Sequence, residues 1–240
     1  MGNDRRRGGA AGSDTVQLVF DVLRVELPED AVRHSRKVWN HVDSLRLDAQ
    51  VASRLARNGI RVGAGTPDAW PAIEAIFNAA GAAVSRSRLT ADAGALMSVV
   101  LGTIEEPESF FFYDFDNRLV GKTFDRGEKT LNLENIILRE LGGRVDLALS
   151  FEIRHDAGDF RWDKTREGIT AVPTVERHVF GTTRVSLALA PGEFVVVGPS
   201  DEAENEYLVG GRFFLGDSDG NPRETMLCIV PKVLRTAASE

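Results

Sequence analysis

A chain of 240 residues is long enough for one large domain or two small ones, with a core that needs no disulfides or metal ions to hold it together. Its net charge of -7 at pH 7 argues against nucleic acid as the main partner, because phosphate binding needs a basic face. No apolar run reaches the length of a membrane-spanning helix, although the weak signal of single strands leaves a transmembrane β-barrel open.

Residues 1–14 predict a disordered N-terminal segment. They are rich in Gly, Ala and Arg and show no apolar periodicity. No apolar stretch follows the charged start, so the sequence as written contains no signal peptide. Such a segment is also typical of the flexible tether behind the lipid-modified cysteine of a lipoprotein, so membrane association through a lost lipid anchor stays open.

Residues 15–81 predict a small αβ lobe. Apolar residues occupy even positions up to Val22 and odd positions from Leu23 onward, so the first strand, 15–27, is expected to contain a β-bulge. A short strand is expected at 60–62. The expected helices cover residues 29–42, then 48–58 with Asp48 as N-cap and Asn58-Gly59 as the stop, then 66–81.

A glycine-rich segment, Gly63-Ala64-Gly65, separates the short strand from the third helix. It lacks the third glycine of a dinucleotide-binding fingerprint and the Lys-Ser/Thr pair of a P-loop. A tight strand-to-helix turn explains the glycines, and no cofactor is expected.

Residues 82–240 predict an antiparallel β-rich domain, because apolar strand-like segments there alternate with turns rich in Gly, Asp and Pro. The strand candidates are 83–89, 95–101, 109–115, 129–141, 144–154, 169–178, 183–190, 194–198, 207–215 and 224–234. The expected fold class is therefore α+β, with the αβ lobe followed by a mainly antiparallel β-rich domain.

The segment 184–198 predicts a hairpin around which the last third of the chain is organised. Pro191-Gly192 suits a type II turn, since proline presets φ at the second position and glycine accepts positive φ at the third. With this turn as the whole loop, Val185, Leu187 and Leu189 would share a face with Phe194 and Val196. Because both faces are fairly apolar, the hairpin needs cover from a larger sheet or a neighbouring subunit.

Metal binding is not predicted. His34 and His41 are seven residues apart without the Glu-x-x-His arrangement of a zinc protease. The oxygen-rich turns at 114–117 and 217–221 lack the twelve-residue pattern and closing glutamate of an EF-hand. Ordinary turn chemistry explains both.

Catalytic residues are not predicted either. His155-Asp156 stands in an expected loop that runs to Asp163, and Asp156 with Asp159 could in principle serve hydrolysis, but carboxylates in exposed loops are usually solvated. No Gly-x-Ser-x-Gly elbow is present. The one cysteine, Cys228, lies in an apolar strand and is expected to be a buried small hydrophobe.

An aromatic run, Phe110 to Tyr113 with Phe115, places five rings in six positions of an expected strand. Rings then point to both sides of the strand, so both faces need cover. An interior strand is the default interpretation; a subunit interface and a membrane-facing lip are the alternatives.

The ordered motifs of the last third resemble the C-terminal β-domain of secretins, the outer-membrane ring proteins of type II and type III secretion and of type IV pili. They are Val172-Pro173-Thr174-Val175-Glu176-Arg177, Gly181-Thr182-Thr183-Arg184-Val185-Ser186-Leu187, Pro191-Gly192-Glu193-Phe194-Val195-Val196-Val197-Gly198 and a last strand ending in Ile229-Val230-Pro231. The resemblance covers at most residues 130–235. Secretins usually continue into Gly-Gly-Leu, where this chain has Pro199 and an acidic run.

The resemblance implies a non-enzymatic structural component of a bacterial cell envelope, periplasmic or at the outer membrane. Such a protein would self-associate, as a homo-oligomeric ring, and would contact other envelope or secretion components. It would need no catalytic, cofactor-binding or metal-binding residues.

The alternative is a soluble ligand-binding protein or small hydrolase. Its site would lie between the αβ lobe and the β-domain, near residues 63–70 and 155–162. That hypothesis requires both segments to line one pocket.

Overall fold

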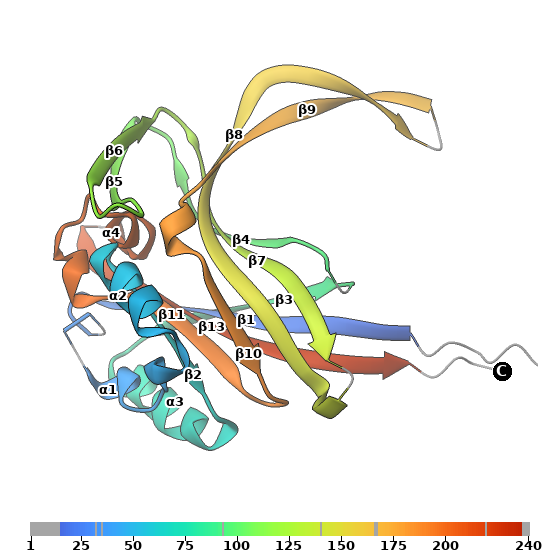
Figure 1. Ribbon diagram of the computed structural model, residues 1–240. Helices are drawn as coiled ribbons and strands as arrows, with labels where there is room; N and C mark the ends of the chain where they lie inside the picture. The colour runs from blue at the N-terminus through green and yellow to red at the C-terminus, as the bar shows by residue number, and fades with distance from the viewer. Residues whose placement is uncertain are drawn as a thin grey trace, which may run out of the picture.

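The computed structural model describes residues 15–236 except 32, 35, 93, 140, 166–167 and 219, so the predicted disordered segment lies outside the described residues. As expected, the fold is α+β, with mostly antiparallel strands and a few short helices. Two large sheets pack face to face, and a small two-stranded sheet lies at one end (Figure 1).

The first sheet joins both ends of the described chain. Its strand order is β2-β11-β13-β1-β3, and β12 pairs with β13. It therefore contains strands from both predicted segments, 15–81 and 82–240. The strands are β1 (Thr15–Pro28), β2 (Ile60–Gly65), β3 (Ala83–Ala91), β11 (Phe194–Pro199), β12 (Leu215–Ser218) and β13 (Asn221–Thr236).

The change of apolar phase in β1 does not produce a bulge, so that prediction was wrong. The ladder between β1 and β13 is continuous from Thr15 with Thr236 to Pro28 with Arg223. Even positions such as Phe20 pack in the cluster between the two sheets, and odd positions such as Val25 pack in a second cluster under α1 and α3. The phase changes because different layers cover the two faces at different points along the strand.

The second sheet has the order β10-β8-β7-β4, with β9 paired to β8. Its strands are β4 (Met97–Ile104), β7 (Gly127–Arg139), β8 (Arg144–Thr165), β9 (Gly168–Val179) and β10 (Val185–Leu189). The two-stranded sheet pairs β5 (Glu108–Tyr113) with β6 (Leu119–Phe124), a strand that the sequence analysis did not anticipate.

For the predicted hairpin at 184–198, the turn is confirmed and the strand pairing is wrong. The turn forms as expected, with Gly192 at φ +82° and the Glu193 N–H donating to the Ala190 carbonyl at 3.0 Å. The strands do not pair with each other, because β10 pairs with β8 while β11 pairs with β2 and β13. The turn carries the chain from one sheet to the other, so the inward side chains of β10 share the main core with Val195 and Val197 of β11. The predicted partners Phe194 and Val196 face the second cluster instead, so that part of the prediction was wrong.

Of the predicted helices, the second and third form near their expected positions. Asp48 accepts N-cap hydrogen bonds from the N–H groups of Gln50 and Val51. The predicted helix at 29–42 is reduced to four residues, because Asp30 adopts a φ of +62°. The helices are α1 (Arg36–Trp39), α2 (Ala49–Arg57), α3 (Trp70–Ala79) and α4 (Val209–Phe214), with 3-10 turns η1 (Ser44–Arg46), η2 (Pro67–Ala69), η3 (Leu141–Gly143), η4 (Gly181–Thr183) and η5 (Asp201–Glu204).

The predicted strand at 207–215 is wrong, since most of it forms α4. The Gly210 N–H donates to the carbonyl of Asn58 at 2.8 Å, so the helix packs directly on the end of α2. The predicted glycine turn at 63–65 is part of β2 instead. Gly65 lies under the ring of Phe194, where a Cβ would be 2.2 Å from Cζ, so its role is close packing between β2 and β11.

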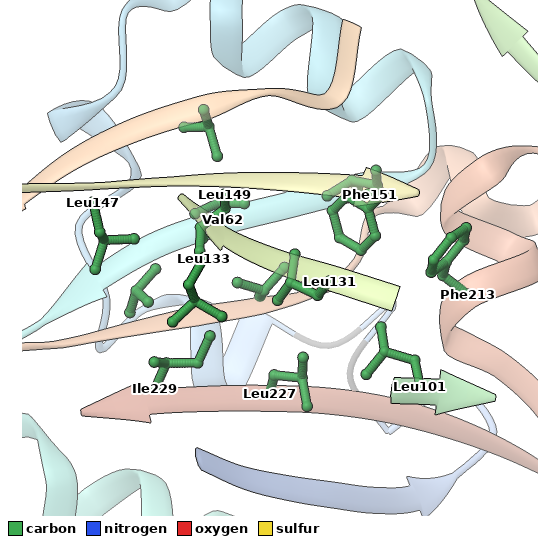
Figure 2. Close-up of a cluster of buried hydrophobic side chains, with 14 of the residues drawn as sticks. Val62, Leu101, Leu131, Leu133, Leu147, Leu149, Phe151, Phe213, Leu227 and Ile229 are labelled. Atoms are coloured by element: carbon green, nitrogen blue, oxygen red, sulfur yellow. The ribbon is translucent and has the colours of Figure 1, made fainter. Parts of the chain in front are cut away.

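The main core lies between the two large sheets. Figure 2 shows leucines and a phenylalanine of β7 and β8 facing Leu227 and Ile229 of β13. All of these side chains are buried. Cys228, on the opposite face of β13, is fully buried as predicted, and burial raises the pKa of its thiol to about 12.

Candidate functional site

The outer part of β8 and β9 projects from the body of the molecule as a curved two-stranded ribbon (Figure 1). β7 pairs with β8 only as far as Arg154, and beyond that residue β8 pairs with β9 alone. We call residues 155–165 and 168–176 the ribbon. The expected loop from His155 to Asp163 is therefore wrong, because this segment is a continuous part of β8.

One face of the ribbon is apolar and exposed to solvent. Residues that pair across an antiparallel ladder share a face, as do residues two apart in a strand. Trp162 pairs with Ala171 and Phe160 with Pro173, so the aromatic residues share a face with the odd positions of β9. On this face Phe160 is 65% exposed, Trp162 73%, Ile169 71% and Val175 45%.

The opposite face of the ribbon is polar where its side chains are described. Thr170, Thr174 and Glu176 occupy even positions of β9, and Glu176 pairs with His155 at 3.0 Å. The ribbon is thus amphipathic, with four large apolar side chains on one face, which Lys164 also shares as the ladder partner of Ile169. Exposed apolar patches of this kind mark surfaces that bind other proteins or membranes.

A buried carboxylate fixes the base of the ribbon. Glu152 is fully buried, and Arg177 of β9 binds its Oε2 through Nε at 2.8 Å and Nη2 at 2.6 Å. Arg154 lies 3.7 Å from the other carboxylate oxygen. Leaving a buried carboxylate unpaired is costly, so these contacts stabilise the pairing of β8 with β9 where the ribbon leaves the sheet.

Aromatic rings surround His178 beside this base. The imidazole lies 5.0 Å from the ring of Phe180 and 5.3 Å from that of Phe124, and Lys122 Nζ is 3.1 Å from its Nδ1. Burial, and secondarily the charge of Lys122, lower the pKa of His178 below its usual value of 6.5. The neutral ring accepts a hydrogen bond from Lys122, which ties β6 to β9.

This arrangement predicts that acid weakens the contact between β6 and β9. A histidine with a lowered pKa binds fewer protons when folded than when unfolded, so its contribution to stability is lost as the pH falls from above 6.5 through the folded-state pKa. We expect the free energy of unfolding of the native protein, measured by urea denaturation, to fall more between pH 7.5 and 5.5 than that of His178→Gln. The control is His41→Gln, which removes an exposed histidine that takes no part in the contact between β6 and β9. Identical pH dependence in all three proteins would contradict this assignment.

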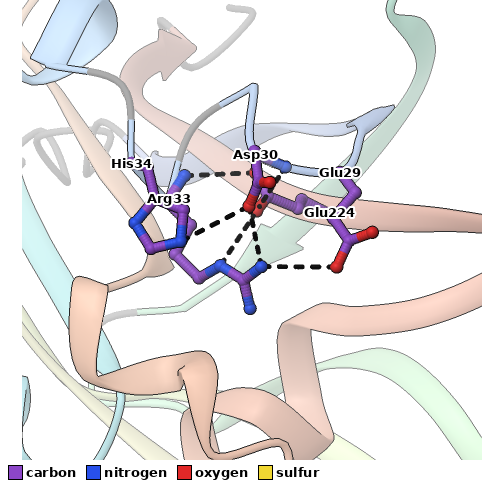
Figure 3. A network of polar contacts seen from close by, with 5 residues as sticks. All are labelled: Glu29, Asp30, Arg33, His34 and Glu224. Atoms are coloured by element: carbon purple, nitrogen blue, oxygen red, sulfur yellow. Dashed lines mark hydrogen bonds and ion pairs between the residues drawn. The ribbon is translucent and has the colours of Figure 1, made fainter.

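A cleft of about 720 Å³ lies elsewhere and is lined mainly by polar and charged residues. Arg33 and Glu29 form part of its wall, and Figure 3 shows the contacts that hold them. Glu224 of β13 is fully buried and accepts from the N–H groups of Asp30 and Arg33 at 3.0 and 3.1 Å. Arg33 Nη2 in turn donates to the Asp30 carboxylate at 2.8 Å. The network fixes the loop between β1 and α1 to the sheet.

The two segments of the alternative site, 63–70 and 155–162, line different clefts. Pro67 and Trp70 line one cleft, whereas His155 and Gly158 line another. Figure 1 places α3 and the ribbon on opposite sides of the molecule. The side chains of Asp156 and Asp159 lie outside the described residues.

Several residues that the sequence analysis compared with metal sites form local contacts within the protein. His34 lies 3.4 Å from Asp30, and Asp114 accepts from the backbone and side chain of Arg118, which lowers the pKa of that carboxyl. Asp217 accepts from the Gly220 N–H, and Asp219 lies outside the described residues. Among the described side chains, no three of His, Cys, Asp and Glu gather as a metal site.

The aromatic run is divided between core and surface. Phe110 is fully buried among Phe124, Phe180 and Phe213, while Phe115, beyond the end of β5, is 68% exposed. Phe110 is thus a core residue, but the interior-strand prediction was wrong, because among the described strands β5 forms a ladder with β6 alone. None of the helices in the described ranges has the length and apolar character that crossing a membrane requires.

Sequence reasoning missed Glu152, Glu224 and Arg33, because each depends on partners more than 20 residues away in the chain. It also missed the β8 half of the ribbon, although it predicted the β9 half as the strand at 169–178. The alternation of Phe160 and Trp162 with polar residues was a usable signal for a strand, but the charged residues around them suggested a loop.

Comparison with known proteins finds little. No protein-family model matches the chain, and no curated protein matches it. Among solved structures, the InvG secretin domain β-barrel from the Salmonella SPI-1 injectisome NC-base is similar, with 11% identity and a TM-score of 0.26. The match covers 91% of this chain and spans 62% of that chain. These values describe a weak and distant secretin-like resemblance.

Proposed function

We propose that this protein is a non-enzymatic structural component of a bacterial cell-envelope assembly and that it self-associates through the β8–β9 ribbon. The observation that carries the proposal is the exposed apolar face of the ribbon, formed by Phe160, Trp162, Ile169 and Val175. Covering four large apolar side chains removes substantial area from water, at about 25 cal/mol per Å².

The ribbon also has unpaired edges. Beyond Arg154, β8 has lost β7 as a neighbour, and among the described strands β9 pairs only with β8. Free strand edges expose N–H and C=O groups that readily pair with another chain. Copies placed side by side would satisfy these groups and cover the apolar face together, which is how a closed ring is expected to form.

The ordered motifs at 172–233, which resemble the secretin β-domain, support the envelope setting of the proposal. They include part of the ribbon itself, at Thr174 to Glu176. The proposed partners are copies of this chain and other components of an envelope or secretion assembly. The proposed structural role requires no catalytic residue.

Mass photometry at micromolar concentration tests the proposal. We expect the native protein to form oligomers and the double variant Phe160→Lys with Trp162→Lys to be monomeric, because charged side chains cannot be buried between copies without partners. The matched control carries Thr170→Lys and Thr174→Lys on the polar face and should assemble like the native protein. A native protein that is monomeric at all concentrations would refute self-association, and equal assembly of both variants would refute the role of the apolar face.

A further inference from the structure

A separate cleft of about 560 Å³ lies on the face of the first sheet that is turned away from the second sheet. Helix α3 covers part of this face, while β1, β3 and β13 run on beyond the helix (Figure 1). Pro67 and Trp70, at the start of the helical segment, form one wall of the cleft. The volume falls within the range of small-ligand sites, roughly 300 to 1,000 Å³.

The floor of the cleft is apolar. Leu23 and Phe194 line it and are almost fully buried, and Val230 beside them is half-buried. The ring of Trp70 meets Phe194 edge to face, with centroids 5.4 Å apart and planes at 84°. Because Phe194 is held by β2 and β11, the aromatic part of the cleft is preformed.

The rim of the cleft is cationic, in contrast to the acidic chain as a whole. Three cationic side chains line it, Arg86, Arg88 and Lys232. Asp21 forms ion pairs with Arg88 at 2.8 Å and with Lys232 at 2.5 Å, and these hydrogen bonds lower the pKa of the Asp21 carboxyl. Arg86, two ladder pairs away opposite Leu23, is exposed, and within the described residues no carboxylate pairs with it. One guanidinium is therefore available beside an apolar floor.

We propose that this cleft binds a small amphipathic carboxylate, with its aromatic or branched apolar part on Trp70 and Phe194 and its carboxylate on Arg86. A planar guanidinium binds a carboxylate through two parallel hydrogen bonds. This function is additional to self-association, and the cleft is built from elements other than the ribbon.

Isothermal titration of the full chain with 4-phenylbutyrate and with its neutral amide tests the proposal. We expect the acid to bind at least tenfold more tightly than the amide. Arg86→Gln should weaken binding of the acid about tenfold and leave the amide unchanged. Arg126→Gln, which removes an exposed arginine from the turn between β6 and β7, is the matched control and should bind the acid like the native protein.

Circular dichroism of each variant verifies that it is folded, and quenching of tryptophan fluorescence, which Trp70 should report, gives a second readout in the native protein. Equal affinity for acid and amide would overturn the proposal. So would an unchanged affinity in Arg86→Gln, or no binding of the acid at millimolar concentration. None of these results would bear on the oligomeric state.

Discussion

Replacing Gly210 by alanine is expected to destabilise this chain severely. A Cβ at Gly210 would lie 2.0 Å from the carbonyl oxygen of Gly59 and 2.2 Å from its carbonyl carbon. The obstructing atoms are backbone, so they cannot rotate away as a flexible side chain would. The Gly210 N–H also donates to Asn58 across the same contact. Relief of the clash requires α4 to separate from α2.

The expected cost exceeds about 4 kcal/mol, in the range of mutations that disrupt a packed core, and domains of this kind have only about 5–15 kcal/mol in total. The measurement is the free energy of unfolding from urea denaturation, with soluble expression as a first indication. Gly216→Ala is the matched control, because a Cβ there meets no atom within 4 Å. That variant should lie within about 0.5 kcal/mol of the native protein. Similar stability of the two variants would contradict the proposed contact.

The same contact shows where sequence reasoning stops. The helix caps at Asp48 and Asn58-Gly59 were predictable, because capping depends on residues close in the chain. The helix at 209–214 was predicted as a strand, since its conformation depends on Gly210 fitting against Gly59, 151 positions earlier. Local apolar pattern carries no information about that approach.

The sheets show the same division. Most strands of the β-rich part were predictable from alternation and turn residues, and the turn at Pro191-Gly192 formed as expected. The pairing of the strands was not predictable. The apolar residues of β10 and β11 are compatible both with a hairpin and with two strands in stacked sheets. The β8 half of the ribbon lay within a predicted loop for a related reason, whereas its β9 half was predicted as the strand at 169–178. Its apolar side chains are exposed, so they do not mark a core.

Loss of the Glu224 carboxylate is the second large effect that we expect. Glu224→Ala leaves Arg33, 8% exposed, without its partner on β13 and leaves the N–H groups of Asp30 and Arg33 without their acceptors. Asp30 and Glu29 still pair with Arg33, so the cost comes mainly from the two N–H groups, at about 1–3 kcal/mol for each buried donor left without an acceptor. The free energy of unfolding from urea denaturation measures this loss.

A double-mutant cycle with Arg33→Ala separates the pair from other effects. If the cost of Glu224→Ala arises from an uncompensated Arg33, the double variant should be less destabilised than the sum of the two single variants, by about 1–3 kcal/mol. Glu26→Ala in the neighbouring strand β1 is the control, because Glu26 forms a half-exposed pair with Arg24 that is worth about 1 kcal/mol or less. Additive single effects would mean that Glu224 stabilises the loop through its backbone contacts alone, and that Arg33 is held by Asp30 and Glu29.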